Sequence, residues 1–222
     1  MKKVLPKLIH YNQVGYVKER NIVENIRSMA DILEYTKRNN LPGLFLCIDF
    51  EKAFDSLEWK FLFLTLKNRN FGPSFIHWVE TLYRNILSCI INNGHTSPYF
   101  AVKRGVRQGD PLSPYLFIIA IEILAQAVRA NPNIQGIKVG EREEKLLQYA
   151  DDATGVLRDV KSAKNFLDTT KVFGGYSGLK LNVEKTEGFW LGSWRHSAAK
   201  PLGISWTKHI KITGAYFSYQ VS

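Results

Sequence analysis

The sequence contains only two cysteines, Cys47 and Cys89, among 222 residues. This scarcity excludes a disulfide framework and a zinc site built from cysteine ligands. Cys47 lies in an apolar run and is predicted to be a small core residue. No run reaches the roughly 18 consecutive apolar residues that span a bilayer, and the basic N-terminus lacks the apolar segment of a secretory signal. We therefore expect an intracellular protein with no membrane partner, with the nucleus and the cytoplasm both compatible.

Two common nucleotide-binding patterns are also missing. The chain has no GxxxxGK[ST] loop and no GxGxxG turn, so neither a P-loop nor a Rossmann site is supported. Acidic residues are few, because 20 Asp and Glu stand against 30 Lys and Arg, for a net charge of +10. A basic surface is common in soluble proteins, and it also attracts polyanions such as nucleic acids. Charge alone leaves both interpretations open.

Hydrophobic spacing predicts a mixture of helices and short strands without strict alternation, which is typical of an α+β fold. Helices are predicted over residues 21–39, 57–68, 72–85 and 160–176, and from Ser113, as the helix cap, with Pro114 in the first turn, to about residue 128. Strands are predicted over residues 44–50, 134–139, 145–150, 153–158, 189–194 and 209–217, with a strand–turn–strand unit over 88–105.

Aspartates interrupt two of the apolar strand patterns. Asp49 ends the run LFLCIDF, and Asp151 and Asp152 lie between the apolar arms of LLQYADDATGVL, as at the tip of a tight hairpin. A charge at the end of a buried strand is costly unless it is paired or binds a metal. The alternative is that each aspartate only forms or caps a turn.

Three clustered carboxylates repel one another unless a cation is present. They suit two Mg²⁺ or Mn²⁺ ions, which prefer hard oxygen ligands and bind through carboxylates and substrate phosphates. Such a pair, about 3.5–4 Å apart, activates an attacking 3′-hydroxyl and stabilises the leaving pyrophosphate. Asp49 and Asp151 would bridge both ions, the backbone carbonyl of Phe50 would add a ligand, and Asp152 would be an outer or alternating ligand.

A basic, glycine-containing segment, KRGVRQGDPLSPYLF (103–117), lies between the two acidic sites. Arg107, Gln108 and Gly109 precede the predicted helix start at Ser113. A helix N-terminus presents free N–H groups that suit a phosphate or nucleotide, and glycine permits close approach of the backbone. The alternative is an ordinary loop that caps a helix.

In their order and spacing, these segments resemble a reverse transcriptase, most closely the type encoded by LINE-like non-LTR retrotransposons. The resemblance covers about residues 10–220 and implies a right-hand polymerase: a palm sheet backed by helices, with part of the fingers. The matching segments are DFEKAFDSLEW (49–59, motif A), GVRQGDPLSP (105–114, motif B), YADD (149–152, motif C), SGLKLNVEKTE (177–187, motif D), FWLG (189–192, a primer-grip hairpin) and QVGYVKER (13–20, fingers).

The resemblance implies an RNA-directed DNA polymerase and gives roles to individual positions. Asp49, Asp151 and Asp152 correspond to the metal-binding carboxylates. Phe54, after Ala53 in the nucleotide site, corresponds to an aromatic gate whose ring would clash with a ribose 2′-hydroxyl. The remaining positions are Gln108 and Gly109 beside the incoming nucleotide and template base, Arg107 nearby, Lys185 as proton donor or electrostatic partner of the pyrophosphate, and Trp190, Leu191 and Gly192 supporting the primer terminus.

The same resemblance assigns the whole chain, residues 1–222, to one reverse transcriptase domain. It places partial fingers at about 1–42 and 60–104, the palm at about 43–59 and 105–195, and the start of the thumb region at about 205–222. It implies an RNA template, a DNA primer and deoxynucleoside triphosphates as partners. The full-length polyprotein is expected to add the upstream fingers, the thumb and an endonuclease.

Several alternatives remain open from sequence. The chain is either an active polymerase core or a retrotransposon remnant that acts at most as a nucleic-acid-binding module. An unrelated two-metal nuclease would not need Phe54 or Gln108, and a group II intron or retron-type enzyme is a near relative of the preferred reading. Lys185 has the alternative of an ordinary surface lysine. Asp55 is expected to be structural, capping the helix at Leu57.

Overall fold

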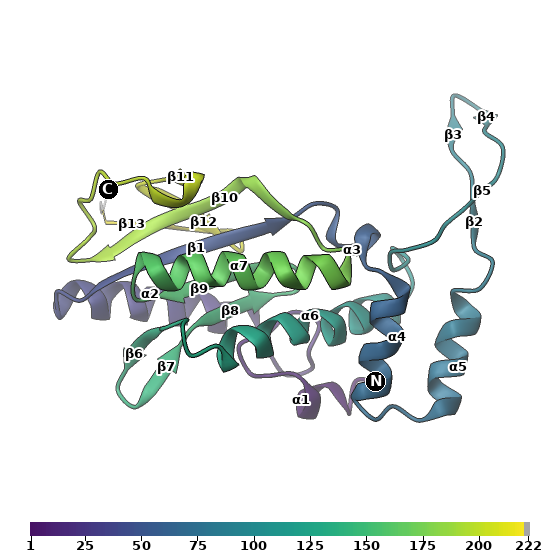
Figure 1. Ribbon diagram of the computed structural model, residues 1–222, viewed down its shortest axis with the longest axis horizontal. Coiled ribbons are helices and arrows are strands. Elements are labelled where there is room, and N and C mark those ends of the chain that lie inside the picture. The colour runs from purple at the N-terminus through teal and green to yellow at the C-terminus, as the bar shows by residue number, and fades with distance from the viewer. Residues whose placement is uncertain (220–222) are drawn as a thin grey trace.

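A five-stranded sheet forms the centre of the structure, a computed structural model that describes residues 1–219 (Figure 1). Its strand order is β11-β10-β1-β9-β8, and every neighbouring pair is antiparallel except β10 with β11. The strands are β1 (Pro42–Phe50), β8 (Leu146–Tyr149), β9 (Asp152–Leu157), β10 (Leu181–Gly192) and β11 (Ser205–Trp206). The α+β class predicted from sequence is confirmed.

The central strand β1 is buried on both faces, which explains why it reads as a continuous apolar run. Side chains alternate along a strand, so Leu44, Leu46 and Ile48 point to one face while Phe45 points to the other. Phe45 stacks near Phe189 of β10, with ring centroids 6.4 Å apart. Two separate apolar clusters therefore hold the same strand in place.

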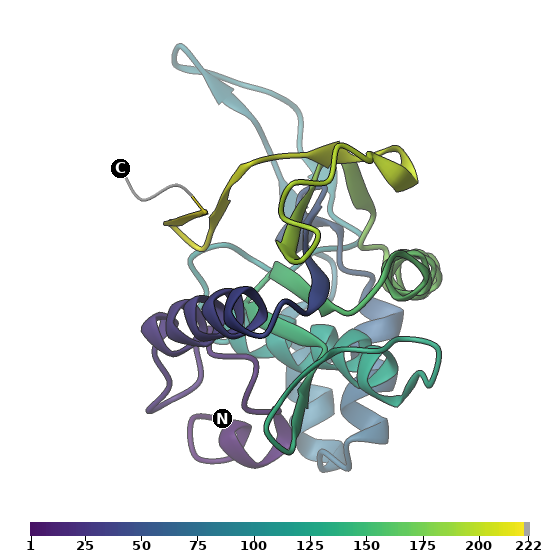
Figure 2. The same cartoon turned by 90° about the vertical axis from the view of Figure 1, so that its left-hand side faces the viewer.

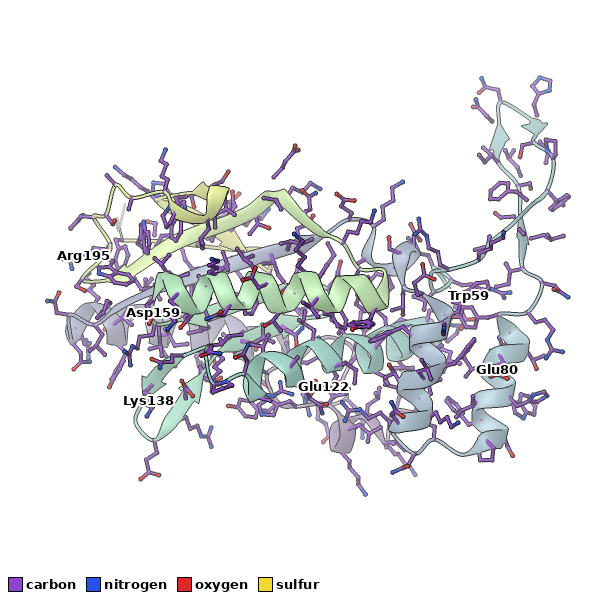
Figure 3. All side chains as sticks on the ribbon, in the orientation of Figure 1. Trp59, Glu80, Glu122, Lys138, Asp159 and Arg195 are labelled. Atoms are coloured by element: carbon purple, nitrogen blue, oxygen red, sulfur yellow. The ribbon has the colours of Figure 1, made fainter. Side chains whose placement is uncertain are left out.

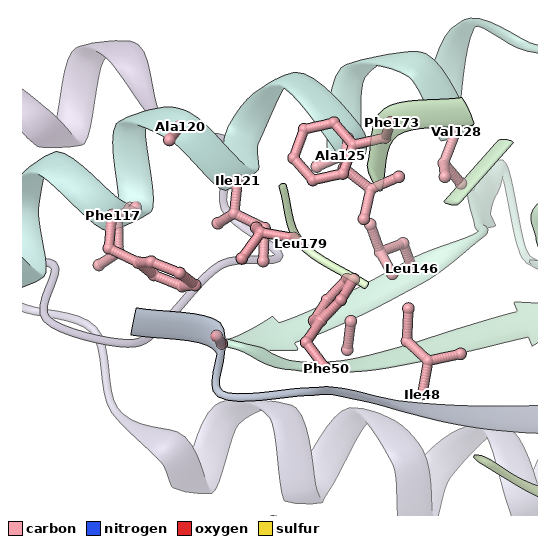
Figure 4. Packing of buried hydrophobic residues seen from close by; sticks show 14 of the residues in the cluster. Ile48, Phe50, Phe117, Ala120, Ile121, Ala125, Val128, Leu146, Phe173 and Leu179 are labelled. Carbon is pink, nitrogen blue, oxygen red and sulfur yellow. The ribbon is translucent and has the colours of Figure 1, made fainter. Parts of the chain in front are cut away.

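Helices cover one face of the sheet and build the larger cluster (Figure 4). They are α4 (Trp59–Asn68), α6 (Ser113–Ala130) and α7 (Val160–Ser177). Phe117 and Ile121 of α6 lie with Phe50 of β1 and Phe173 of α7 in this cluster. By length and composition alone α6 could cross a membrane, but 61% of it is buried inside the protein. Its apolar character therefore matches its position as a core helix.

The other face of the sheet carries α2 (Ile22–Arg38) and the hairpin of β12 (His209–Ile212) and β13 (Ala215–Ser218). Figure 2 shows α2 and α7 on opposite sides of the sheet. Asn21 caps α2 by accepting a hydrogen bond from the Val23 amide at 3.1 Å. Asp159, labelled in Figure 3, caps α7 in the same way through the Ser162 amide at 2.7 Å. Both caps fix where these helices begin.

The remaining elements are short and lie around this centre. A thin arm extends away from the sheet after α5 and carries β2 to β5 (Figure 1). These elements are α1 (Leu5–Leu8), α3 (Ala53–Ser56), α5 (Pro73–Leu82), β2 (Leu87–Ser88), β3 (Ile91–Asn92), β4 (His95–Thr96), β5 (Phe100–Ala101), β6 (Ile137–Val139), β7 (Arg142–Glu144) and the 3₁₀ turn η1 (Pro201–Gly203).

Several sequence expectations need correction. Ser113 does not cap α6: it is the first helical residue, and the Asp110 carboxylate accepts from the Leu112 amide at 2.7 Å instead. The segment predicted as a strand over 209–217 turns at Thr213 and Gly214 to form β12 and β13. The strand–turn–strand unit over 88–105 consists of four two-residue strands. Between residues 134 and 139 the strand begins only at Ile137.

The predicted division into fingers, palm and thumb region stays a prediction. At the N-terminus, α1 contacts α6, and α2 contacts β8 and β10 of the central sheet. The described end of the predicted thumb region folds as β11 to β13, and residues 220–222 lie outside the described part of the chain. The N-terminal segment thus packs against the central sheet and its helices.

Gly178 gives a direct test of how α7 docks on motif A. It has φ +80°, and a Cβ there would lie 2.4 Å from the Ser56 carbonyl oxygen. Gly178→Ala is expected to lower the free energy of unfolding by about 2–4 kcal/mol, because left-handed strain and backbone overlap add. The matched control is Gly175→Ala on the exposed face of α7, where a Cβ meets nothing within 4 Å.

The control substitution is expected to raise the free energy of unfolding by about 0.5–1 kcal/mol, because alanine loses less backbone entropy in a helix. Urea denaturation of the three proteins measures both effects. Equal unfolding midpoints for the two variants would contradict the docking of Gly178.

Candidate active site

Asp49 lies at the end of β1, where the strand emerges from the core. Its neighbours Ile48 and Phe50 are each 4% exposed and point into the helix-covered cluster, so alternation turns Asp49 to the opposite face. The pairing of β1 with β10 shifts here, from Cys47 with Glu187 to Asp49 with Asn182. A bulge of this kind redirects side chains next to a site. Asp49 is thereby presented to solvent, with 39% of its side chain exposed.

Asp151 and Asp152 lie at the tip of the β8–β9 hairpin, as the sequence predicts. Tyr149 pairs with Asp152, which leaves Ala150 and Asp151 as the turn. Ala150 has φ +52°, an uncommon conformation for a residue with a side chain. Asp151 is half-buried and Asp152 is exposed.

The strand register brings the two acidic segments together. Residues of β1 and β9 pair from Leu44 with Leu157 through Ile48 with Ala153, and the pairing ends there. Asp49 and Asp152 are the next residues on the two strands beyond this last pair, and the charge of Asp49 acts on both Asp151 and Asp152. The three carboxylates therefore gather at one end of the sheet, with Asp151 in the adjoining turn.

Burial and mutual repulsion perturb this group. Burial, and secondly the charge of Asp49, raise the pKa of Asp151 above its usual range. Partial loss of hydration of its carboxylate, followed by the charges of Asp151 and Asp49, likewise raises the pKa of Asp152, although the residue as a whole is exposed. Lys185 of β10 places its Nζ 3.8 Å from Oδ2 of Asp49. The site therefore holds more negative charge than this single lysine compensates.

The oxygen atoms present are the ligands of a site for a hard cation, but the side chains that carry them do not converge on one point. Within residues 1–219, no group of three or more His, Cys, Asp or Glu side chains converges closely enough to hold a metal ion. Carboxylate oxygens of Asp49, Asp151 and Asp152 are the ligand type that Mg²⁺ and Mn²⁺ take. The raised pKa values mean that a nearby cation would relieve an existing repulsion. The chemistry fits a divalent ion, provided that the side chains rotate toward it.

A pocket of about 480 Å³ opens beside Asp49 and the backbone of Phe50. Its acidic lining consists of Asp49 and Glu51. The cationic side chains that line it come from motif A, from the residue just before motif B and from motif D: Lys52, Arg104, Lys180 and Lys185. Four cations beside two carboxylates make a pocket that suits a polyphosphate.

Motif B is fastened to motif A through the backbone. The Gly105 amide donates to the Leu57 carbonyl, and the Val106 amide donates to the Phe54 carbonyl, both at 2.7 Å. Trp59, labelled in Figure 3, donates its indole N–H to the Gly105 carbonyl at 2.7 Å. Gly105 has φ +87°, and a Cβ there would lie 2.7 Å from the Asp55 carbonyl oxygen. Only glycine allows this approach.

The polar residues of motif B remain exposed next to this contact. Gln108 donates from Nε2 to Oδ1 of Asp55 at 3.3 Å, and Arg107 donates to the Leu82 carbonyl at 2.9 Å. Gly109 has φ +89° and open space around it. The expected capping role of Asp55 is wrong, because this residue lies inside α3 and accepts from Gln108 instead. The predicted roles of Arg107, Gln108 and Gly109 stay predictions.

Phe54 is half-buried and has a fixed orientation. Its ring stacks on Phe117 of α6, with centroids 4.3 Å apart and planes 17° apart. Ala53, the residue before it, is 4% exposed. Because α6 belongs to the core, the position of the Phe54 ring is set by the core itself.

The hairpin expected at FWLG is not observed. Trp190, Leu191 and Gly192 form the end of the long strand β10 and pair with Leu44, Gly43 and Pro42 of β1. This is the end of β1 that lies away from Asp49. Trp190 is only 7% exposed, because its ring stacks on Trp206 at 3.8 Å and meets Trp194 edge-on at 5.4 Å. The hairpin is absent here because β10 runs from motif D to Gly192, and the first hairpin after that motif is β12–β13. The predicted contact of these three residues with the primer stays a prediction.

One polar residue that contacts the aspartate turn was not identified from sequence. Gln13, in the segment that resembles the fingers, is 1% exposed and hydrogen-bonds to both backbone groups of Ala150 in the aspartate-bearing turn. The available signal was a polar residue close to Gly15 in a segment that becomes buried, because a buried amide requires hydrogen-bond partners. Its partner could not be read from the chain, since the two residues are 137 positions apart.

The chain is similar to known proteins over nearly all of its length. The family model for reverse transcriptase (RNA-dependent DNA polymerase) matches residues 1–217. The transposon TX1 uncharacterized 149 kDa protein of Xenopus laevis is 33% identical over 221 residues, covering 98% of this chain and 17% of that protein. The Pol polyprotein of the type-2 retrotransposable element R2DM of Drosophila melanogaster is 30% identical over 173 residues, covering 78% and 16%. This chain thus spans about one sixth of each of these relatives.

Solved structures agree on the fold. Telomerase from Candida albicans, in complex with a fragment of telomeric RNA, aligns with a TM-score of 0.68 at 14% identity, covering 97% of this chain and 35% of that one. At this identity the likeness establishes the polymerase palm and fingers fold alone. Together with the motif order and the strand register described above, the family match is decisive. The chain belongs to the reverse transcriptase (RNA-dependent DNA polymerase) family, among relatives from non-LTR retrotransposons.

Proposed function

We propose that this chain is the catalytic core of an RNA-directed DNA polymerase that adds deoxynucleotides to a primer 3′-hydroxyl by two-metal nucleotidyl transfer. The observation that carries the proposal is the placement of Asp49 and Asp152 just beyond the last pair of β1 and β9, beside Asp151 and next to a pocket with four cations. The partners follow from this chemistry: an RNA template, a DNA primer and deoxynucleoside triphosphates. The relatives named as transposon and Pol proteins support the same reading.

The three aspartates would hold the two divalent ions, with the Phe50 backbone carbonyl as a further ligand. Bound ions of this kind lower the pKa of the attacking hydroxyl and neutralise the leaving group. The protein's own contribution would be to hold three carboxylates close together despite their repulsion. β1 and the β8–β9 hairpin do this, because both are fixed by pairing within the sheet.

The cationic pocket would hold the triphosphate of the incoming nucleotide. Lys52, Arg104 and Lys180 line it together with Lys185, which also reaches Asp49. An ammonium group at Lys185 can stabilise charge that develops on the departing pyrophosphate, or donate a proton to it. Gly109 and Gln108 lie on the exposed side of motif B, where a template base can approach. The positive net charge of +10 favours a nucleic-acid partner.

Primer extension on poly(rA)/oligo(dT) with Mg²⁺ tests the proposal. The chain is expected to incorporate dTMP, and Asp151→Asn to reduce incorporation to background, because the neutral amide cannot hold a divalent ion. Asp31→Asn, on the exposed surface of α2, is the matched control and should retain the full rate.

Equal background incorporation by the chain and by Asp151→Asn would contradict catalysis and favour a remnant that only binds nucleic acid. Loss of primer without addition of nucleotides would instead favour a nuclease.

Thermal denaturation tests the carboxylate repulsion without requiring activity. At neutral pH and without Mg²⁺, Asp151→Asn is expected to raise Tm by about 2–4 °C, equivalent to about 1 kcal/mol in a chain of this size. The burial and repulsion that raise the pKa of Asp151 destabilise the folded state above that pKa. As pH falls through the raised pKa, Asp151 takes up a proton and the advantage of the variant disappears.

The effect of Mg²⁺ on Tm supplies the second half of this test. Mg²⁺ is expected to raise the Tm of the wild-type chain more than that of Asp151→Asn, because binding to the folded state stabilises it. Asp31→Asn should respond like the wild type. An Mg²⁺ response in Asp151→Asn as large as in the wild type would contradict the metal site.

Phe54 would act as the sugar gate, and its stacking on Phe117 makes this testable. Phe54→Val is expected to improve kcat/KM for a ribonucleotide relative to the matching deoxynucleotide by about tenfold or more, because the rigid ring that overlaps the 2′-hydroxyl is gone. Single-nucleotide incorporation with each substrate measures the ratio. Phe61→Val, a half-buried phenylalanine on α4, is the control for lost packing alone. An unchanged ratio in Phe54→Val would refute the gate.

A further inference from the structure

The outer edge of β8 is covered by a short segment from the N-terminal part of the chain. β8 is the last strand of the sheet, so its free backbone groups need partners. The Gln148 amide donates to the Asn12 carbonyl at 2.9 Å, and the Val14 amide donates to the Gln148 carbonyl at 3.1 Å. Residues 12–15, hereafter the edge segment, thus continue the sheet beside the strand that leads into the aspartate turn.

The side chain of Gln13 holds the turn itself. Its Nε2 donates to the Ala150 carbonyl at 3.1 Å, and its Oε1 accepts from the Ala150 amide at 2.8 Å and from the Gly15 amide at 2.9 Å. The side chain is buried, with 1% exposure of the residue. One amide group therefore binds both backbone polar groups of the residue immediately before Asp151.

The residue that Gln13 holds is conformationally strained. Ala150 has φ +52°, a conformation that is unfavourable for a residue with a Cβ and persists only where the surroundings impose it. The edge segment approaches closely enough to do so, because a Cβ on Gly15 would lie 2.5 Å from the Ala150 nitrogen. The strain and its support occur at the turn that carries the candidate metal ligands.

Arg20 fixes the edge segment in turn. Its guanidinium donates to the carbonyl of Gln13 at 2.8 Å and to three carbonyls upstream, those of Pro6, Ile9 and His10. Four acceptors around one guanidinium leave the loop little freedom. The Gln13 side chain is therefore held on a rigid support.

We propose that Gln13 is a positioning residue that orients the Ala150 peptide and so places the Asp151 carboxylate for nucleotidyl transfer. The proposal rests on the proposed polymerase function. Gln13 touches neither substrate nor metal ligand side chains in this role. It acts through the backbone, because the peptide between Ala150 and Asp151 sets the direction of the Asp151 side chain.

Asn12 provides the matched control, since it is a buried amide one residue away. It is 3% exposed and donates from Nδ2 to the Leu146 carbonyl and to Oε2 of Glu144, both at 2.6 Å. These partners lie at or before the start of β8, at the opposite end from the aspartate turn. Removing Asn12 therefore weakens the same edge contact without releasing Ala150.

The experiment compares Gln13→Met, Asn12→Leu and Asp151→Asn in the 222-residue chain. Gln13→Met is expected to lower kcat for primer extension by about tenfold or more, because small displacements of a reacting group have large effects on rate. The KM for the deoxynucleotide should change by less than about twofold, while half-maximal rate requires several-fold more Mg²⁺. Asn12→Leu should keep kcat within about twofold of the wild-type value, although its unfolding midpoint should fall by about as much as that of Gln13→Met.

Hydrogen–deuterium exchange supplies a readout that does not depend on activity. In Gln13→Met, exchange at Ala150–Asp152 is expected to accelerate several-fold, while exchange in β1 stays at the wild-type rate. Acceleration throughout the sheet would mean that Gln13 is only structural and would overturn the proposal, as would unchanged exchange at the turn.

The outcomes separate the two proposals. Wild-type incorporation no greater than that of Asp151→Asn would refute the polymerase function, and the positioning role with it. An active wild type, an inactive Asp151→Asn and equal rates for Gln13→Met and Asn12→Leu would refute the positioning role alone.

Discussion

The register of β1 against β9 is the constraint on which the candidate site depends. Asp49 and Asp152 directly follow the last pair of these two strands, and like charges close together on neighbouring strands destabilise a sheet, so the rest of both strands must fix their position. One residue of slip would move Asp49 to the helix-covered face and bury its charge. The apolar residues at Phe45 and Ile48 prevent this slip, since each belongs to a different buried cluster.

Segments that are distant in sequence converge on this pair through backbone contacts. The Gly105 amide binds the Leu57 carbonyl, the Glu58 amide binds the Ser177 carbonyl, and the Glu51 amide binds the Lys180 carbonyl. Motifs A, B and D are thus joined main chain to main chain, and the side chains of Lys185 and Gln108 are left exposed, where each contacts an aspartate of motif A. Each of these motifs supplies one edge of the same small surface, although the motifs are far apart along the chain.

Most of the fold could be predicted from sequence because its elements carry strong local signals. The helices at Ile22–Arg38 and Val160–Ser177 have clear apolar spacing, and the run through Asp49 reads as a buried strand. β10 was predicted only around residues 189–194, because its first half is exposed and polar and contains the bulge opposite Asp49. A local sequence pattern does not reveal a strand whose conformation depends on pairing with the neighbouring strand.

The site was predictable where chemistry is concentrated in a few residues, and not where it depends on packing. Three aspartates in two apolar runs indicated a metal site, and the pairing of β1 with β9 brings them together. Two contacts join residues that are far apart in sequence: Phe54 stacks on Phe117, 63 positions away, and Gln13 hydrogen-bonds to Ala150, 137 positions away. Neither contact produces a periodic pattern in the sequence. The burial of Trp190 was missed for the same reason, because Trp194 and Trp206 cover it.

The two ends of the sheet differ in what they contain. The end that carries the aspartates has like charges close together, a bulge in β10 and Ala150 at positive φ. The other end contains the stacked rings of Trp190 and Trp206 and the close fit of Gly192 against the Leu41 carbonyl. Unfavourable local geometry persists in a folded protein only where other contacts offset it. At the aspartate turn those contacts are the pairing of β8 with β9 and the hydrogen bonds from Gln13 to Ala150, so the turn depends on support from a segment far away in sequence.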